Sequence, residues 1–208
     1  MSRISAGVFS KAFSAAWKET CADDLSGPAG APSLCERYVS DGDWTNYLLK
    51  DAEAAFMQKV VDKIKNSHEA GDLILIRERY TVDAIIASTD DMLGRSGYPS
   101  RIDVLIEHEN GDNWQEEMWK LLFFRAPLKV LIGYDYYESD RRADLAKKGA
   151  WLCGKIETLR KMHGEFAAGQ KDDSEYLLIV GDRAGRNAAD GVRWRKCLLS
   201  SGPDLEEL

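Results

Sequence analysis

The stretch Arg101–Asn110 reads Arg-Ile-Asp-Val-Leu-Ile-Glu-His-Glu-Asn. From Ile102 onward, mostly apolar residues at even positions alternate with mostly acidic residues at odd positions. This alternation predicts a β-strand whose successive side chains leave by opposite faces. One face then carries Asp103, Leu105, Glu107 and Glu109. Like charges held this close are unfavourable unless a cation or a proton lies between them. The face is therefore either a solvated surface or a metal-binding site, and the strand alone leaves both interpretations open.

The composition is that of a globular protein. The chain has 208 residues, of which 44% are hydrophobic and 30% charged, values usual for a single domain. No segment approaches the ~20 consecutive apolar residues that span a bilayer, and no signal-peptide core is recognisable. Four cysteines lie far apart without a Cys-x-x-Cys pair, which disfavours a zinc site and fits free thiols in a reducing compartment. We expect a cytoplasmic protein.

The strand that precedes Arg101 carries a further carboxylate, Asp83. If residues 80–87 and 101–109 pair as an antiparallel hairpin, positions that sum to about 190 face each other, with Cβ atoms roughly 5 Å apart. Asp83 then lies opposite Glu107, whereas Asp103 lies at the loop end of the hairpin. Because side chains alternate between faces, a slip of one residue would move Asp83 to the other face of the sheet.

The rest of the sequence predicts helices and strands that complete a mixed sheet. We expect helices over residues 4–18, 44–65, 114–125 and 140–166, and strands over 73–79, 80–87, 101–109, 128–134, 176–180 and 192–199. The order strand, helix, strand over 101–134 predicts a parallel crossover. The acidic tail after Gly202 is expected to be frayed. We predict one domain over residues 1–208, with an N-terminal helical layer at 1–40, a core at 44–135, and a C-terminal helix and strands at 136–200.

Glu53 stands out in the helix expected over residues 44–65. In a helical projection the apolar residues of this segment share one arc, and Glu53 falls near its middle. A carboxylate in such a position needs a partner, because burying an unpaired charge costs several kcal/mol. Glu53 is therefore expected either to form an ion pair at the edge of the core or to point at the same cation as the strand carboxylates.

The order of these acids along the elements resembles that of the PD-(D/E)xK nuclease superfamily, which has the restriction-endonuclease-like fold. That family carries an Asp on the second core strand and a Glu-x-Lys signature on the third. Asp83 matches the Asp and Glu107 matches the Glu. Glu109 stands where the family usually has Lys, as in a minority of type II restriction enzymes, and Val82 replaces the Pro of the family name.

Helical residues extend the resemblance. Glu53 matches the acidic residue that many members carry on the first core helix. Lys120, on the helix that follows the signature strand, resembles a lysine that has migrated from the usual position. Glu117 on the same helix resembles an accessory polar residue found there in some members.

The resemblance implies an α/β fold, with a three-layer core in which a central mixed sheet is flanked by helices. It also implies a Mg²⁺- or Mn²⁺-dependent endonuclease that hydrolyses phosphodiester bonds of DNA or RNA. Asp83 and Glu107 would bind the metal, with the carbonyl of His108 as a further ligand, and the metal would activate a water molecule. Glu109 or Lys120 would orient that water or accept its proton. Glu53 would hold a second metal or a metal-bound water.

Arginines on predicted loops are candidates for phosphate contacts, and solvated surface positions are the alternative. These arginines are Arg95, Arg101, Arg183 and Arg186. The net charge of −7 argues against binding through overall basicity but leaves room for a local basic groove. Cutting both strands of a duplex usually needs two sites, which suggests a homodimer.

Two other readings stay open at this point. One is a catalytically inactive member of the same fold that binds nucleic acid or a protein. The other is an unrelated α/β protein whose acidic strand is solvated or ion-paired.

Overall fold

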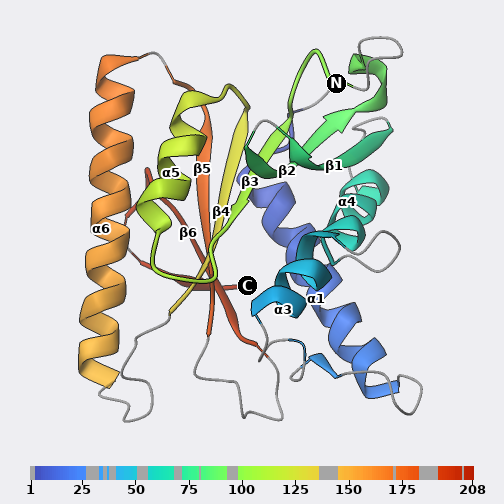
Figure 1. The fold of residues 1–208 in the computed structure, drawn as a ribbon, viewed down its shortest axis with the longest axis horizontal. Coiled ribbons are helices and arrows are strands. Elements are labelled where there is room, and N and C mark those ends of the chain that lie inside the picture. The colour runs from blue at the N-terminus through green and yellow to red at the C-terminus, as the bar shows by residue number, and fades with distance from the viewer. Residues whose placement is uncertain are drawn as a thin grey trace.

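The computed structural model describes residues 3–26, 33–34, 37, 41–50, 56–67, 72–79, 81–92, 98–135, 145–170, 172–182, 192–202 and 204–208. In this part of the chain, helices surround one seven-stranded mixed sheet (Figure 1). The strands are β1 (Leu73–Arg79), β2 (Val82–Ser88), β3 (Val104–His108), β4 (Leu128–Tyr134), β5 (Glu175–Gly181), β6 (Trp194–Leu198) and β7 (Glu206–Glu207). The helices are α1 (Ala6–Ser26), α3 (Asp41–Thr45), α4 (Phe56–Ser67), α5 (Trp114–Phe123) and α6 (Leu145–Gly169), with a π-helical segment (Asn46–Lys50) and a 3-10 turn (Thr89–Asp91).

The strands lie in the sheet in the order in which they occur in the sequence. β1, β2 and β3 form an antiparallel meander. β3, β4 and β5 are parallel to one another, and β5, β6 and β7 are antiparallel again. These pairs are parallel because α5 and α6 each carry the chain back to the end of the sheet at which the preceding strand begins. The predicted mixed sheet and its crossover over residues 101–134 are therefore confirmed.

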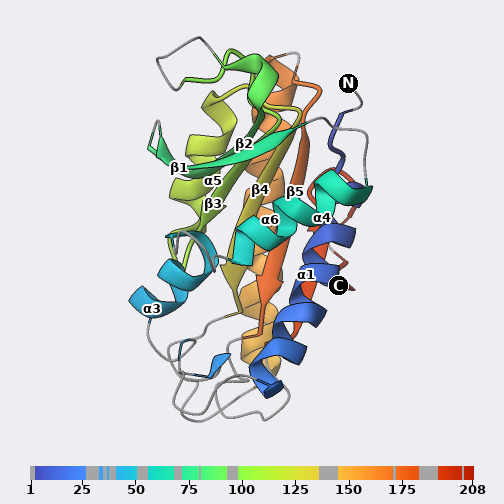
Figure 2. The same ribbon diagram turned by 90° about the vertical axis from the view of Figure 1, so that its right-hand side faces the viewer.

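Helices cover both faces of the sheet, and each face has its own apolar core. On one face α1, α3 and α4 pack against side chains such as Val104 and Ile106, and Figure 2 shows α1 and α4 in front of the strands. On the other face α5 and α6 pack against side chains such as Leu105 and Leu131. The hydrophobic stripe of α4 is completely buried, as its helical spacing predicts.

The register of the β2–β3 hairpin decides where its carboxylates lie. Ala84 pairs with Ile106, and Ile85 pairs with Leu105, so paired positions sum to 190 as predicted. Asp83 and Glu107 continue this register on the face that Ile85 and Leu105 share, which is the face covered by α5. The predicted register, on which the placement of Asp83 depends, is confirmed.

One expectation is corrected by the structure, and another is tested only in part. The helix expected over residues 44–65 is described as α3, the π-helical segment and, from Phe56, α4, and residues 51–55 lie outside the described residues. The tail expected to be frayed instead adds the short edge strand β7, whose Glu206 pairs with Lys196 of β6. Their side chains are 3.9 Å apart, so the acidic tail is attracted to basic residues of β6. None of the described helices has the length and apolar character needed to cross a membrane.

Gly133 in β4 lies directly against the start of α5. A Cβ atom at this position would lie 2.5 Å from the indole ring of Trp114, the first residue of α5. Real Cβ atoms do not come this close to a ring, so a larger residue would displace the start of α5. Since α5 carries Glu117 and Lys120, this contact helps to fix the position of both side chains.

We therefore predict that Gly133→Ala lowers the free energy of unfolding by about 1–3 kcal/mol, because overpacking forces Trp114 out of its place. Urea unfolding followed by circular dichroism measures the change. Gly149→Ala is the matched control, because a Cβ atom there meets nothing within 4 Å and the helical glycine is replaced by a better helix former. The control is expected to be neutral or slightly stabilising, and equal losses in both variants would contradict the proposed contact.

Candidate metal centre

Three carboxylates from three elements converge beneath the N-terminal half of α5. Asp83 comes from the start of β2, Glu107 from the end of β3, and Glu117 from the first turn of α5. One carboxylate oxygen from each lies within 4.8 Å of the other two. Carboxylate oxygens at this spacing can share one divalent cation. The hairpin register brings the first two together, and the helix that follows β3 supplies the third.

Asp83 is held in place by the backbone of the neighbouring strand. Its Oδ2 atom accepts a hydrogen bond of 2.8 Å from the main-chain N–H of His108. Because this donor belongs to the strand that carries Glu107, the distance between the two carboxylates depends on the pairing of β2 with β3. The main chain of β3 thus orients the carboxylate of Asp83.

Glu107 is the most enclosed member of the group, with no solvent-exposed surface. Its Oε2 atom is 3.1 Å from the ammonium group of Lys120. Its Oε1 atom is also buried and accepts no hydrogen bond from the described residues. A buried carboxylate oxygen without a donor is costly, so this atom marks the place where a proton or a cation would be most stabilising.

Lys120 joins the carboxylates as the positive member of the cluster. Its ammonium group forms ion pairs with Glu107 and with Glu117, which is three residues earlier on the same helix. Burial alone would lower the pKa of Lys120, but hydrogen bonds and charges from Glu117 and Glu107 outweigh it and raise the pKa above its usual value. One ammonium group faces three carboxylates, so two negative charges remain when all three are ionised.

A proton on Glu107 relieves part of this charge. Burial raises the pKa of Glu107 to about 9, assisted by a hydrogen bond to Glu117 and by the negative charges of Asp83 and Glu117. That hydrogen bond exists only when a proton lies between the two carboxyl groups. At neutral pH and without a cation, Glu107 is therefore mainly protonated, and Lys120 is paired chiefly with Glu117.

Glu109 lies beside the group of three rather than within it. Its carboxylate accepts a hydrogen bond from the main-chain N–H of Gly111, and a Cβ atom on Gly111 would come within 2.8 Å of it. Burial and the charges of Glu117 and Asp83 raise the pKa of Glu109, although the Gly111 hydrogen bond opposes them. In this structure Glu109 shapes the turn that leads into α5.

The side chain of His108 lies on the opposite face of the sheet. Its Nε2 atom is 2.8 Å from the hydroxyl of Tyr134, and that hydroxyl also accepts a hydrogen bond from the indole N–H of Trp44. The imidazole therefore belongs to the aromatic core beneath α3 and cannot meet a cation bound to Glu107. The predicted ligand is the main-chain carbonyl of His108, and the position of the ring does not test that prediction.

The candidate phosphate contact Arg101 lies far from the carboxylates. It forms an ion pair of 3.2 Å with Asp103, four residues before Glu107, which is roughly 13 Å along the strand. Arg101 and Glu107 are thus at opposite ends of β3. Four other predicted site residues fall outside the described part of the chain: Glu53, Arg95, Arg183 and Arg186.

Glu117 is the residue whose importance the sequence understated. It resembles an accessory residue in the sequence, but in the structure it is one of the three converging carboxylates and a partner of Lys120. The sequence feature that points to Glu117 is its spacing of three residues from Lys120, on the helix that directly follows the acidic strand.

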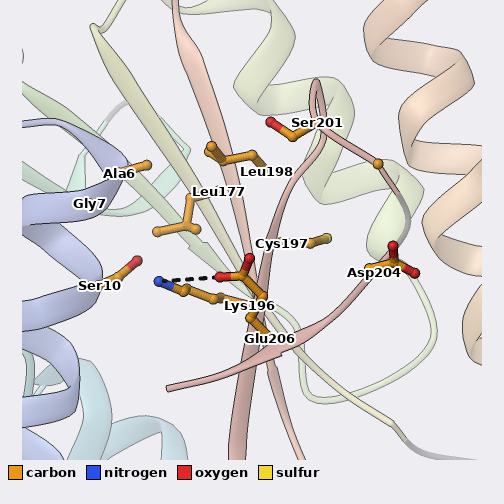
Figure 3. A pocket seen from close by; sticks show the side chains of 11 residues that line it. Ala6, Gly7, Ser10, Leu177, Lys196, Cys197, Leu198, Ser201, Asp204 and Glu206 are labelled. Carbon is orange, nitrogen blue, oxygen red and sulfur yellow. Dashed lines mark ion pairs between the residues drawn. The ribbon is translucent and has the colours of Figure 1, made fainter.

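A pocket of about 300 Å³ elsewhere in the molecule has no part in this cluster (Figure 3). It lies between α1 and β6, where Ser10 faces Lys196 and Glu206. None of the three converging carboxylates lines it.

No protein-family model and no curated protein matches the sequence. The assignment of a function consequently depends on the fold and on the geometry of the carboxylate cluster.

The raised pKa of Glu107 predicts how stability changes with pH when no metal is present. Between the unfolded value of about 4.5 and the folded value of about 9, the folded protein holds one more proton than the unfolded chain. The free energy of unfolding therefore falls as pH rises from about 5 to about 9, by at most ~1.4 kcal/mol per pH unit.

Glu107→Gln should flatten this dependence, because a neutral amide has no proton to lose. Urea unfolding in EDTA at several pH values measures the slope, with Glu165→Gln on the exposed surface of α6 as the control. A slope that is unchanged in Glu107→Gln would show that Glu107 is not protonated in the folded protein.

Proposed function

We propose that this protein is a Mg²⁺-dependent nuclease that hydrolyses phosphodiester bonds of DNA through a restriction-endonuclease-like core. The observation that carries the proposal is the convergence of Asp83, Glu107 and Glu117 within 4.8 Å around a fully buried carboxylate. A structural ion pair needs only one carboxylate for one lysine. The additional carboxylates are ligands of the kind that a divalent cation prefers.

The fold supports the same reading. An antiparallel meander carries Asp83 on its second strand and Glu107 on its third, and a helix then crosses to a parallel strand. This is the element order that the resemblance to PD-(D/E)xK nucleases implies. The matching positions lie on one face of the sheet, as a shared site requires.

The charges of the cluster fit a divalent cation. With Glu107 ionised, the three carboxylates and Lys120 together leave two negative charges, which Mg²⁺ or Mn²⁺ would balance. Mg²⁺ prefers carboxylate and water oxygens over nitrogen or sulfur ligands. Asp83, Glu107 and Glu117 would supply protein ligands, and the cation would take the place of the proton on Glu107.

The bound metal ion and Lys120 would have different roles in the reaction. A metal ion bound there would polarise the scissile phosphate and lower the pKa of a coordinated water. Lys120, released from Glu107 by the cation, would orient the attacking water or stabilise charge on the phosphate. Its position favours Lys120 over Glu109 for this role, because the carboxylate of Glu109 is engaged by the turn at Gly111.

A cytoplasmic location and a homodimer are part of the same proposal. The described cysteines Cys21, Cys153 and Cys197 are free thiols, which fits the reducing cytoplasm expected from the sequence. A homodimer would provide the two sites needed to cut both strands of a duplex.

Cleavage of supercoiled plasmid in the presence of Mg²⁺ tests the activity. We predict that the protein nicks plasmid in Mg²⁺ or Mn²⁺ but not in EDTA. Asp83→Asn and Glu107→Gln should abolish nicking, and Lys120→Met should slow it by roughly 10²-fold, the usual contribution of a group that assists proton transfer.

Glu117→Gln and Glu116→Gln form a matched pair on the first turn of α5. Glu116 is exposed and outside the cluster, so its replacement should leave nicking unchanged, whereas replacement of Glu117 should weaken the Mg²⁺ dependence or remove activity. Binding of DNA without cleavage, indifferent to all these changes, would instead favour a non-catalytic binding protein of the same fold.

Metal binding should also release a proton. Since the pKa of Glu107 is about 9 without a cation, binding of Mg²⁺ at pH about 7 must displace close to one proton from the cluster. Calorimetric titration in buffers that differ in ionisation enthalpy measures this number. Proton release should disappear in Glu107→Gln, and binding without release in the wild-type protein would contradict the exchange.

A further inference from the structure

Exposed aromatic rings lie at the far end of α5. Trp119 is 52% exposed and Phe123 is 68% exposed. Their rings are stacked, with centroids 5.3 Å apart and planes 12° from parallel. Phe166 of α6 meets Phe123 edge-on, with centroids 6.1 Å apart. Large apolar side chains gathered at the surface in this way indicate a binding surface more often than isolated exposed residues do.

This aromatic group borders a pocket of about 470 Å³. Phe123 and Phe166 form part of its wall, and Arg3, Arg125 and Lys129 bring three basic side chains to it. The volume is in the range of pockets that hold a small molecule. Asp172 and Asp173 line it as well, so the lining combines flat apolar rings with three cationic and two anionic side chains.

Lys129 has no positive charge left for a ligand, whereas the guanidinium groups of Arg125 and Arg3 are open to one. Lys129 is neutralised, because its buried ammonium group lies 3.0 Å from Asp172 and 2.6 Å from the hydroxyl of Tyr176. Arg125 is exposed and forms no ion pair with any described carboxylate.

Arg3 is the second cation at the rim. Its guanidinium group donates to the carbonyls of Pro127 and Asp173. Its charge partner is the Asp173 carboxylate, 3.9 Å away and almost fully exposed, so solvent weakens the pair. Because Asp172 and Asp173 also line the pocket, three basic and two acidic side chains leave it one net positive charge, chiefly that of Arg125, in a chain whose net charge is −7.

We propose that this pocket and the adjoining rings bind a nucleoside phosphate. The base would stack on Phe123 or Trp119, because every base offers a π-face to an aromatic side chain. The phosphate would bind the guanidinium groups of Arg3 and Arg125, whose fork of donors suits phosphate oxygens. A purely apolar partner would not use the charge of Arg125, and a purely anionic one would not use the rings.

The position of the pocket connects it to the carboxylate cluster. Lys129 pairs with Leu105 in the parallel ladder, and Glu107 is two residues further along β3. The Cα atoms of Lys129 and Glu107 are thus roughly 8 Å apart on the same face of the sheet. A nucleic-acid strand that passes over Lys120 would reach the pocket within a few nucleotides. The inference that the pocket holds a single-stranded part of the substrate rests on the proposed nuclease function.

Fluorescence anisotropy with labelled oligothymidylate, in EDTA so that no cleavage occurs, tests the binding site. We predict that the protein binds the oligonucleotide, that Phe123→Ala weakens binding about ten-fold through loss of stacking, and that Arg125→Gln weakens it several-fold. Tyr98→Ala and Lys161→Gln, an exposed aromatic and an exposed basic residue elsewhere, are the matched controls and should bind like the wild type.

Competition identifies the source of the nucleotide. Displacement of the oligonucleotide by adenosine monophosphate, but not by adenosine or inorganic phosphate alone, assigns the pocket to free nucleotides. Binding of the oligonucleotide that resists adenosine monophosphate assigns it to a strand.

Other results would overturn the proposal. These are no binding of either ligand at millimolar concentration, equal binding by the Phe123→Ala, Arg125→Gln and wild-type proteins, or conversion of a dimer into a monomer by Phe123→Ala with nucleotide binding unchanged. The last result would show that a second copy of the chain covers the rings. Because the readout needs neither metal nor cleavage, its failure is separate from a failure of plasmid nicking.

Discussion

The crowding of negative charge around the buried carboxylate of Glu107 is the constraint on which the site depends. Three carboxylates share a small volume with one lysine, and one buried oxygen accepts no hydrogen bond from the described residues. Such an arrangement is stable only with a proton or a cation between the acids. The β2–β3 pairing and the packing of α5 hold the acids together, so the fold maintains a charge imbalance that a divalent cation would relieve.

The parts of this arrangement that could be predicted are those fixed by periodicity. Alternation along β3 assigns Glu107 to one face and His108 to the other, and the length of the hairpin places Asp83 beside Glu107. Both inferences use the strict period of two in a β-strand, where an error of one residue reverses every face. The apolar stripe of α4 and the parallel crossover through α5 follow from patterns of the same kind.

The parts that could not be predicted depend on contacts between elements. Sequence spacing shows that Glu117 and Lys120 share a face of α5, but not that this face closes over Glu107. Likewise, Glu109 looks equivalent to Glu107 in the strand pattern. Its hydrogen bond to Gly111 arises from the turn after the strand, which alternation does not describe. The order of the C-terminal tail comes from its pairing with β6 and from the main-chain hydrogen bond between Leu208 and Trp194, which form only in the folded chain.

A crystal structure of the protein soaked in Mn²⁺ tests the central claim most directly, since anomalous scattering identifies the ion. The account predicts a peak within roughly 2.3 Å of carboxylate oxygens of Asp83 and Glu107, with Glu117 in contact directly or through water and with Lys120 displaced from Glu107. A soaked crystal with no ion at these carboxylates, and with the ion pair between Lys120 and Glu107 intact, would contradict it.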